Sequence, residues 1–92
     1  MTENKISLGN NQIVELRNGL YGVVASFNDK PFQIIFRSYT NPISRYSEDL
    51  KNKNSQYDIV KIYDGTNIQN VTDVFKTKFN TDNLKLIWQR ND

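Results

Sequence analysis

Side chains that could bind a partner are concentrated between positions 37 and 53, where arginine, lysine and tyrosine recur at short intervals. The candidate partner-binding residues are Arg37, Tyr39, Arg45, Tyr46, Lys51 and Lys53. Aromatic rings stack on nucleobases and cations hold phosphates, so this set could bind nucleic acid. Tyrosine and arginine also contribute strongly to protein–protein interfaces, so the set could equally contact a protein. A third interpretation is structural: Tyr46 and Leu50 pack on the core and the charged side chains face water.

Catalytic and metal-binding chemistry has few candidate groups in this sequence, which contains neither histidine nor cysteine. Their absence removes thiol nucleophiles, thiolate metal sites, disulfides and the most common general base. Glu48 and Asp49 are the nearest carboxylate pair, but acid–base catalysis needs two carboxyl groups facing each other across a substrate. We interpret this pair as the solvated start of a helix. We therefore predict a protein that is not an enzyme and that holds no metal and no cofactor.

Length and charge restrict the class of protein further. The chain has 92 residues, which is one domain spanning 1–92, with 1–11 expected to form a flexible lead-in. Its net charge of +2 is mildly basic and does not make nucleic acid the default partner. The first ten residues contain no apolar segment typical of a secretion signal, so we expect a cytoplasmic protein.

The elements that must position these side chains begin with three predicted strands. Alternating apolar and polar residues over 12–17 predict a half-buried strand, and Asn18-Gly19 predicts a type I′ turn with positive φ at both positions. The chain returns as a second strand, and Pro31 opens a third over 31–37. The first 37 residues therefore predict a three-stranded meander.

The second half of the chain predicts two strands and one longer helix. A short helical turn is expected from Ser44, and a fourth strand over 57–63. Asn70 can cap a helix that ends at Asn80, with an apolar stripe on one face. The residues of this stripe are Val71, Val74, Phe75 and Phe79. A last strand over 84–90 is expected to place Leu84, Leu86 and Trp88 on one face.

The element order β-β-β-(short α)-β-α-β predicts an α+β fold with one packed helix. Two architectures fit this order: a small, partly open SH3-like β-barrel, or a twisted antiparallel sheet covered by the helix.

The first hairpin, "IVELRNGLYGVVAS", resembles the hairpin of SH3-like and KOW-type modules, with Gly19 and Gly22 at the matching spacing. Such hairpins often contact RNA through basic residues around the turn, and here only Arg17 is in that position. The residues themselves favour a structural interpretation, in which Gly22 permits a bend or a close approach of another chain segment.

The chain as a whole resembles small uncharacterised proteins of phages and prophages of AT-rich Firmicutes. The resemblance is carried by "LRNG", "YSEDL", "YDIVKIYDG" and the terminal "LIWQR". It implies an accessory protein that binds and inhibits a host protein such as a defence nuclease, in the manner of anti-CRISPR proteins. The alternatives are a nucleic-acid-binding module that uses the 37–53 segment, and a structural protein that self-associates through a sheet edge.

Overall fold

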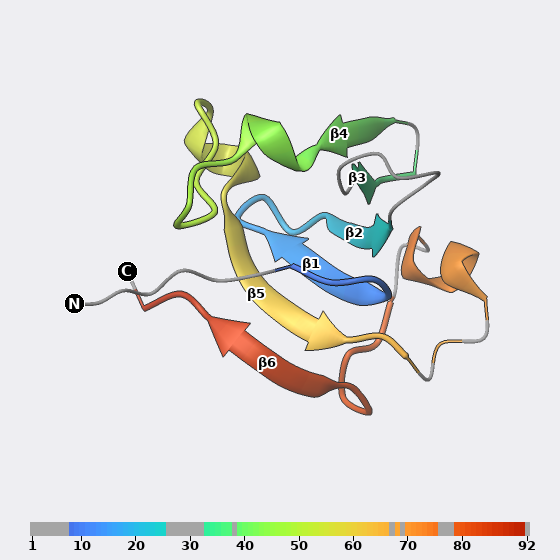
Figure 1. Ribbon diagram of the computed structural model, residues 1–92. Coiled ribbons are helices and arrows are strands. Elements are labelled where there is room, and N and C mark those ends of the chain that lie inside the picture. Colours follow the sequence, from blue (N-terminus) through green and yellow to red (C-terminus); the bar gives the residue numbers. More distant parts are fainter. Residues whose placement is uncertain are drawn as a thin grey trace.

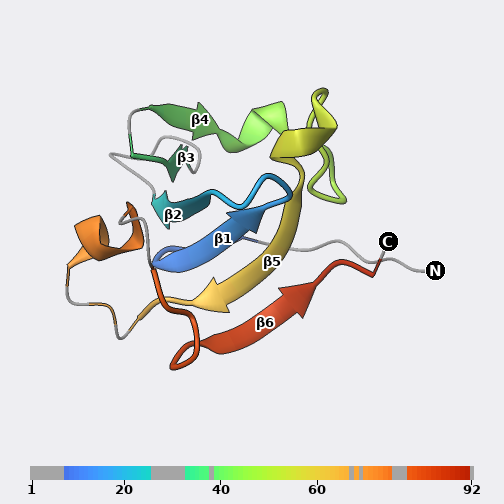
Figure 2. The same ribbon diagram turned by 180° about the vertical axis from the view of Figure 1, so that it is seen from behind.

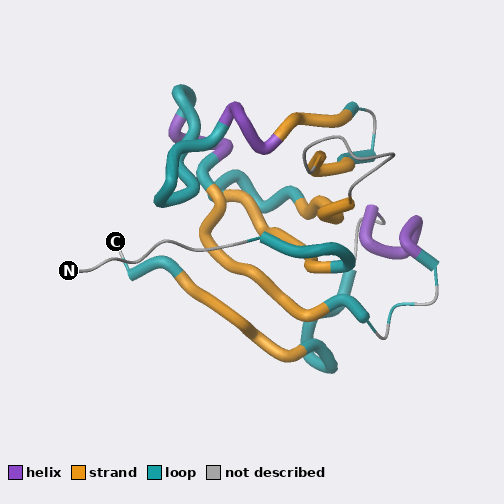
Figure 3. Tube along the Cα trace, in the orientation of Figure 1, coloured by secondary structure: helices purple, strands orange, loops and turns teal. Residues whose placement is uncertain are grey.

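The computed structural model describes residues 8–25, 33–37, 39–66, 68, 70–75 and 79–91, which build one antiparallel sheet of six strands (Figure 1). The strands are β1 (Gln12–Leu16), β2 (Tyr21–Ala25), β3 (Gln33–Ile35), β4 (Thr40–Pro42), β5 (Ile59–Asp64) and β6 (Lys85–Gln89). Three short 3-10 helices accompany them: η1 (Ile43–Arg45), η2 (Ser55–Tyr57) and η3 (Val71–Phe75). Figure 3 shows how little of the described chain is helical.

The strand order is β4-β3-β2-β1-β5-β6, and every neighbouring pair is antiparallel. The predicted meander of the first three strands and the strands near 57–63 and 84–90 are therefore confirmed. Within the described residues β4 and β6 do not pair with each other, so the sheet is open. β4 was not predicted, because Asn41-Pro42 is unusual in a strand and is tolerated here at a sheet edge.

The β1–β2 turn differs from the predicted type I′ turn. Gly19 has a φ of 89°, but Asn18 is not among the described residues with positive φ. The Leu16 N–H donates to the Leu20 carbonyl at 2.8 Å, and the Gly19 N–H donates to the Leu16 carbonyl at 2.9 Å. These bonds close a three-residue loop, in which only the last residue needs the left-handed conformation. The prediction for Gly22 holds, because a Cβ there would lie 2.7 Å from the Ile34 Cγ2 atom.

Both faces of the sheet are covered by apolar side chains, because strand residues point alternately to the two faces. The larger buried cluster contains Val14, Leu16, Val24, Ile34, Phe36, Tyr46, Leu50, Ile59 and Ile62. The smaller cluster, on the other face, contains Ile13, Val23, Tyr63 and Val74. The larger cluster lies under residues 43–58, which we call the 43–58 lobe, and the smaller one lies under η3.

The last strand does not place its apolar side chains on one face, contrary to the prediction. Trp88 is opposite Ile62, but Leu86 is opposite Tyr63, so one extra residue is inserted between them in β6. Such a bulge reverses the alternation. Trp88 consequently packs against the larger cluster and Leu84 against the smaller one, while Leu86 is 44% exposed.

The helix expected over 70–80 is described only as the 3-10 helix η3, and residues 76–78 lie outside the described part. Asn70 does cap it, since its Oδ1 atom accepts from the Thr72 N–H at 3.1 Å. Val74 is buried, and Phe75 and Phe79 pack beside it, whereas the Val71 side chain is not described. β-branched and aromatic residues have low helix propensity, which fits a short 3-10 turn.

The 43–58 lobe and η3 lie at opposite ends of the sheet, as the two views in Figures 1 and 2 show. The short turn predicted from Ser44 is confirmed as η1, and a further 3-10 helix, η2, precedes β5. In the part of the chain that the structure describes, no helix has the length and apolar character needed to cross a membrane.

Candidate binding pocket

An open pocket of about 280 Å³ lies where β4 meets the 43–58 lobe. Its lining residues are Tyr39, Asn41, Arg45, Asn52, Lys53, Asn54 and Tyr57. They come from the turn before β4, from β4 itself, from η1, from the loop that leads into η2 and from η2. We refer to it as the Tyr39–Tyr57 pocket.

One wall of the pocket is the ring of Tyr39, which is 40% exposed. Its other side stacks on Phe36, with ring centroids 4.8 Å apart and an angle of 23° between the planes. The Phe36 N–H also donates to the Tyr39 carbonyl at 2.8 Å, which fixes the turn between β3 and β4. Burial, and to a lesser degree the nearby Tyr57, raises the pKa of the Tyr39 phenol, so its hydroxyl remains a hydrogen-bond donor at neutral pH.

Tyr46 lies in the core and does not line the pocket, contrary to its selection as a partner-binding residue. Its side chain is 8% exposed, and its hydroxyl donates to the Tyr57 carbonyl at 3.0 Å. The side chains of Asn52 and Asn41 lie close enough to this hydroxyl to lower its pKa, against the larger effect of burial. Burial raises the pKa of Tyr46 to about 12. Tyr46 therefore supports the pocket by holding the backbone at Tyr57.

The asparagines of the lobe form consecutive Asx turns, in which the side-chain oxygen accepts from the backbone N–H two residues later, as is common for asparagine in loops. The Oδ1 atom of Asn52 accepts from the Asn54 N–H at 3.1 Å, and the Oδ1 atom of Asn54 accepts from the Gln56 N–H at 3.4 Å. The amide oxygen of Asn54 accepts from the backbone, so its NH₂ group remains as a donor, whereas the side chain of Asn52 also interacts with the Tyr46 hydroxyl. The pocket is consequently rich in donors.

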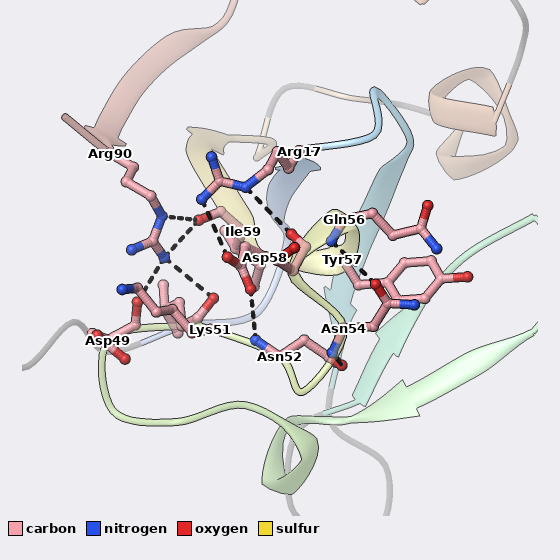
Figure 4. Close-up of polar contacts among 12 residues, drawn as sticks. Arg17, Asp49, Lys51, Asn52, Asn54, Gln56, Tyr57, Asp58, Ile59 and Arg90 are labelled. Atoms are coloured by element: carbon pink, nitrogen blue, oxygen red, sulfur yellow. Dashed lines mark hydrogen bonds and ion pairs between the residues drawn. The ribbon is translucent and has the colours of Figure 1, made fainter. Parts of the chain in front are cut away.

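A buried carboxylate anchors this loop to the first hairpin. Asp58 is 4% exposed and accepts from the Asn52 N–H at 2.8 Å and from Arg17 Nη2 at 3.2 Å (Figure 4). The Arg17 N–H donates to the Asp58 carbonyl at 2.8 Å, and the Asn18 N–H donates to the Gln56 carbonyl at 3.0 Å. The hairpin thus braces the loop from 52 to 58.

A second anchor comes from the C-terminal end of the chain. The Arg90 guanidinium donates to three main-chain carbonyls of the lobe and β5: Ile59 at 2.9 Å, Asp49 at 2.7 Å and Leu50 at 3.3 Å (Figure 4). Leu50 has a φ of 65°, which is unusual for a large apolar residue and is held by this surrounding structure. Its side chain is buried in the larger cluster.

The pocket gathers three of the six selected residues, namely Tyr39, Arg45 and Lys53. Arg37 and Lys51 are exposed but do not line it. Sequence reasoning missed Tyr57, which was read as the start of a strand, and the three asparagines. The run "NKNSQ" at 52–56 was the available signal, because closely spaced asparagines favour side-chain turns that present amide groups.

The exposed carboxylates Glu48 and Asp49 of the 43–58 lobe do not line the pocket. No carboxylate is among the described residues that line it. Asp49 and Arg90 lie on one side of the close-up in Figure 4, and Asn54 and Tyr57 lie on the other. The Ser47 hydroxyl donates to the Asp49 carboxylate and lowers its pKa, so this negative charge persists at neutral pH outside the pocket.

This arrangement can hold a ligand through charge and hydrogen bonds. Cations, phenols and amide NH₂ groups suit an anionic group with many hydrogen-bond acceptors. Among the described residues, no cluster of three acidic, histidine or cysteine side chains could hold a metal ion.

The comparisons with known proteins give no further indication of function. No family model matches the chain, and no curated protein or solved structure is significantly similar to it.

Proposed function

We propose that this chain is a non-catalytic accessory protein that acts by binding a macromolecule through the Tyr39–Tyr57 pocket. The observation that carries the proposal is the composition of the pocket wall, which combines Tyr39, Arg45 and Lys53 with amides and lacks a carboxylate among its described residues. Small-molecule sites span about 300–1,000 Å³ and are mostly enclosed and apolar. A polar, open recess of about 280 Å³ fits one protruding group of a larger partner better.

The partner class that the sequence resemblance implies is a host protein, such as a defence nuclease that a cytoplasmic phage-type protein would inhibit. Tyrosine and arginine at the centre of an exposed recess support this proposal, because these residues contribute most to protein–protein interfaces. The near-neutral charge of +2 also fits a protein partner.

The second candidate partner is a nucleic acid. The specific observation in its favour is that Glu48 and Asp49, which interrupt the basic residues along the sequence, do not line the pocket. A finer description of the fold also remains a proposal: the curved meander β1–β2–β3, with glycines at 19 and 22, is SH3-like.

The experiment that tests the binding role is capture of partners by the tagged full chain from a bacterial lysate, with and without nuclease treatment. The double variant Arg45→Glu/Lys53→Glu reverses both pocket cations. Lys85→Glu is the matched control, because Lys85 is exposed on β6 and does not line the pocket. A partner that the double variant loses and the control retains supports the proposal. Equal capture by all three proteins contradicts it.

A further inference from the structure

The pocket offers hydrogen-bond donors and positive charge beside an exposed aromatic face, and these features together specify a ligand class. Arg45 and Lys53 supply the charge, and the NH₂ group of Asn54 supplies a neutral donor. A matching ligand carries an anion and several acceptor atoms. Phosphate oxygens and carboxylates meet this requirement equally well.

The ring of Tyr39 distinguishes between these two anions. It is exposed on one side and supported on the other by Phe36 at a centroid distance of 4.8 Å. The Phe36 side chain is itself buried in the larger cluster, so the exposed ring is a rigid platform. A planar ligand gains stacking energy on such a platform, whereas an aspartate or glutamate side chain does not.

We infer that the pocket takes one nucleotide of a single-stranded nucleic acid, with the base stacked on Tyr39 and the phosphate held by Arg45 and Lys53. This inference rests on the second candidate proposed above, a nucleic-acid partner, and names the unit of that partner which the pocket takes. A recess of about 280 Å³ admits a base only when that base has left its stack, which favours single strands over duplexes. DNA and RNA share this chemistry, and the described lining does not select between them.

The test is fluorescence anisotropy of the full chain with labelled twelve-nucleotide dT and rU strands, and with a duplex of the same length. Tyr39→Ala should weaken binding of the single strand about 10-fold, because removal of a stacked aromatic costs that order of affinity, and Tyr39→Phe should retain it. Lys53→Gln should reduce the slope of log K against log salt by about 0.7, the value for one phosphate contact on a single strand. Lys85→Gln is the matched control and should change neither quantity.

Three results would overturn the inference: no binding of single strands at low salt, equal affinity for the duplex, or an equal effect of Lys85→Gln. A peptide of ten glutamates separates this failure from failure of the proposed function. If that peptide binds and Lys53→Gln weakens it while the strands do not bind, the pocket is a protein-binding site and only the nucleotide inference is wrong. If neither probe binds, and the pocket variants capture the same partners as the wild type, the nucleotide inference and the proposed function are both wrong.

Discussion

The Nη2 atom of Arg90 lies 2.7 Å from the carbonyl oxygen of Asp49, although 41 residues separate them in sequence. The same guanidinium also reaches Leu50 and Ile59, so the residue after β6 fastens the 43–58 lobe to the sheet. The lobe makes few regular backbone ladders of its own, and its geometry depends on such side-chain anchors.

We expect Arg90→Ala to lower the free energy of unfolding by about 1.5–3 kcal/mol, the range for hydrogen bonds that involve a charged group. Urea denaturation measures this loss, and hydrogen exchange should show faster opening of residues 47–52. Arg45→Ala is the control, because Arg45 is exposed and its truncation should change stability by less than about 0.5 kcal/mol. Equal stability of wild type and Arg90→Ala would show that the anchor is dispensable.

The buried Asp58 should matter more as an acceptor than as a charge. Arg17, its ion-pair partner, has a side chain that is 39% exposed, so water can replace much of that interaction. Asp58→Asn keeps an oxygen for the Asn52 N–H and should cost less than about 1 kcal/mol, whereas Asp58→Ala leaves that N–H unsatisfied and should cost about 1–3 kcal/mol. Chemical denaturation of both variants checks this order. A loss in Asp58→Asn as large as in Asp58→Ala would assign the stabilisation to the ion pair.

Substitution of Gly22, even by alanine, should lower the free energy of unfolding. The added Cβ would lie 2.7 Å from Ile34 Cγ2 and 2.8 Å from Phe36 Cε1, so the core must shift. Overpacking of this kind costs about 1–3 kcal/mol. Gly9→Ala is the matched variant, since its Cβ would meet only Gln12 atoms at 3.9 Å, and it should be nearly neutral. Thermal denaturation compares them, and similar melting temperatures would contradict the close packing across Gly22.

Stability should fall between about pH 10 and pH 12 through Tyr46. Burial raises the pKa of Tyr46 from 10.0 to about 12 in the folded chain, so the unfolded chain loses this proton first as pH rises. The stabilisation is complete below pH 10 and is lost as pH approaches 12, with a total of about 2–3 kcal/mol at 1.36 kcal/mol per pKa unit. Tyr46→Phe removes the titrating group, so its unfolding free energy should fall less steeply across this range. Parallel pH profiles of the two proteins would contradict the assignment.

Strand positions were largely predictable, because alternation over 12–17 and the β-branched run near 57–63 reflect the burial of one or both sheet faces. The bulge in β6 was not predictable, because no residue pattern in the sequence marks it. It is seen only in the pairing of the folded sheet, where Trp88 lies opposite Ile62 and Leu86 lies opposite Tyr63. The bulge departs from the prediction for the last strand, and of the helix expected over 70–80 the described residues show only the 3-10 helix η3.

The sequence indicated the kinds of side chain in the candidate site, but not which residues line the pocket. Three of the residues selected in the segment from 37 to 53, namely Tyr39, Arg45 and Lys53, line the pocket, and their role in binding stays a prediction. No local pattern indicates that Leu50 adopts a left-handed conformation. The turn at Leu50 leads to Asn52, which lines the pocket, whereas Tyr46 is buried in the core. The conformation of this loop depends on hydrogen bonds from the Asn52 N–H to Asp58 and from Arg90 to the Asp49 carbonyl. The periodicity of the sequence does not indicate these contacts.

Chemical-shift mapping of the amide groups of the full chain during titration with single-stranded dT tests the central claim most directly. The claim predicts that shifts concentrate around the pocket, at residues 39–41, 45, 52–54 and 57, and that the amides of β6 stay unchanged. Shifts that cluster on β6 or around η3, with the pocket amides unmoved, would contradict the assignment of the Tyr39–Tyr57 pocket as the binding site.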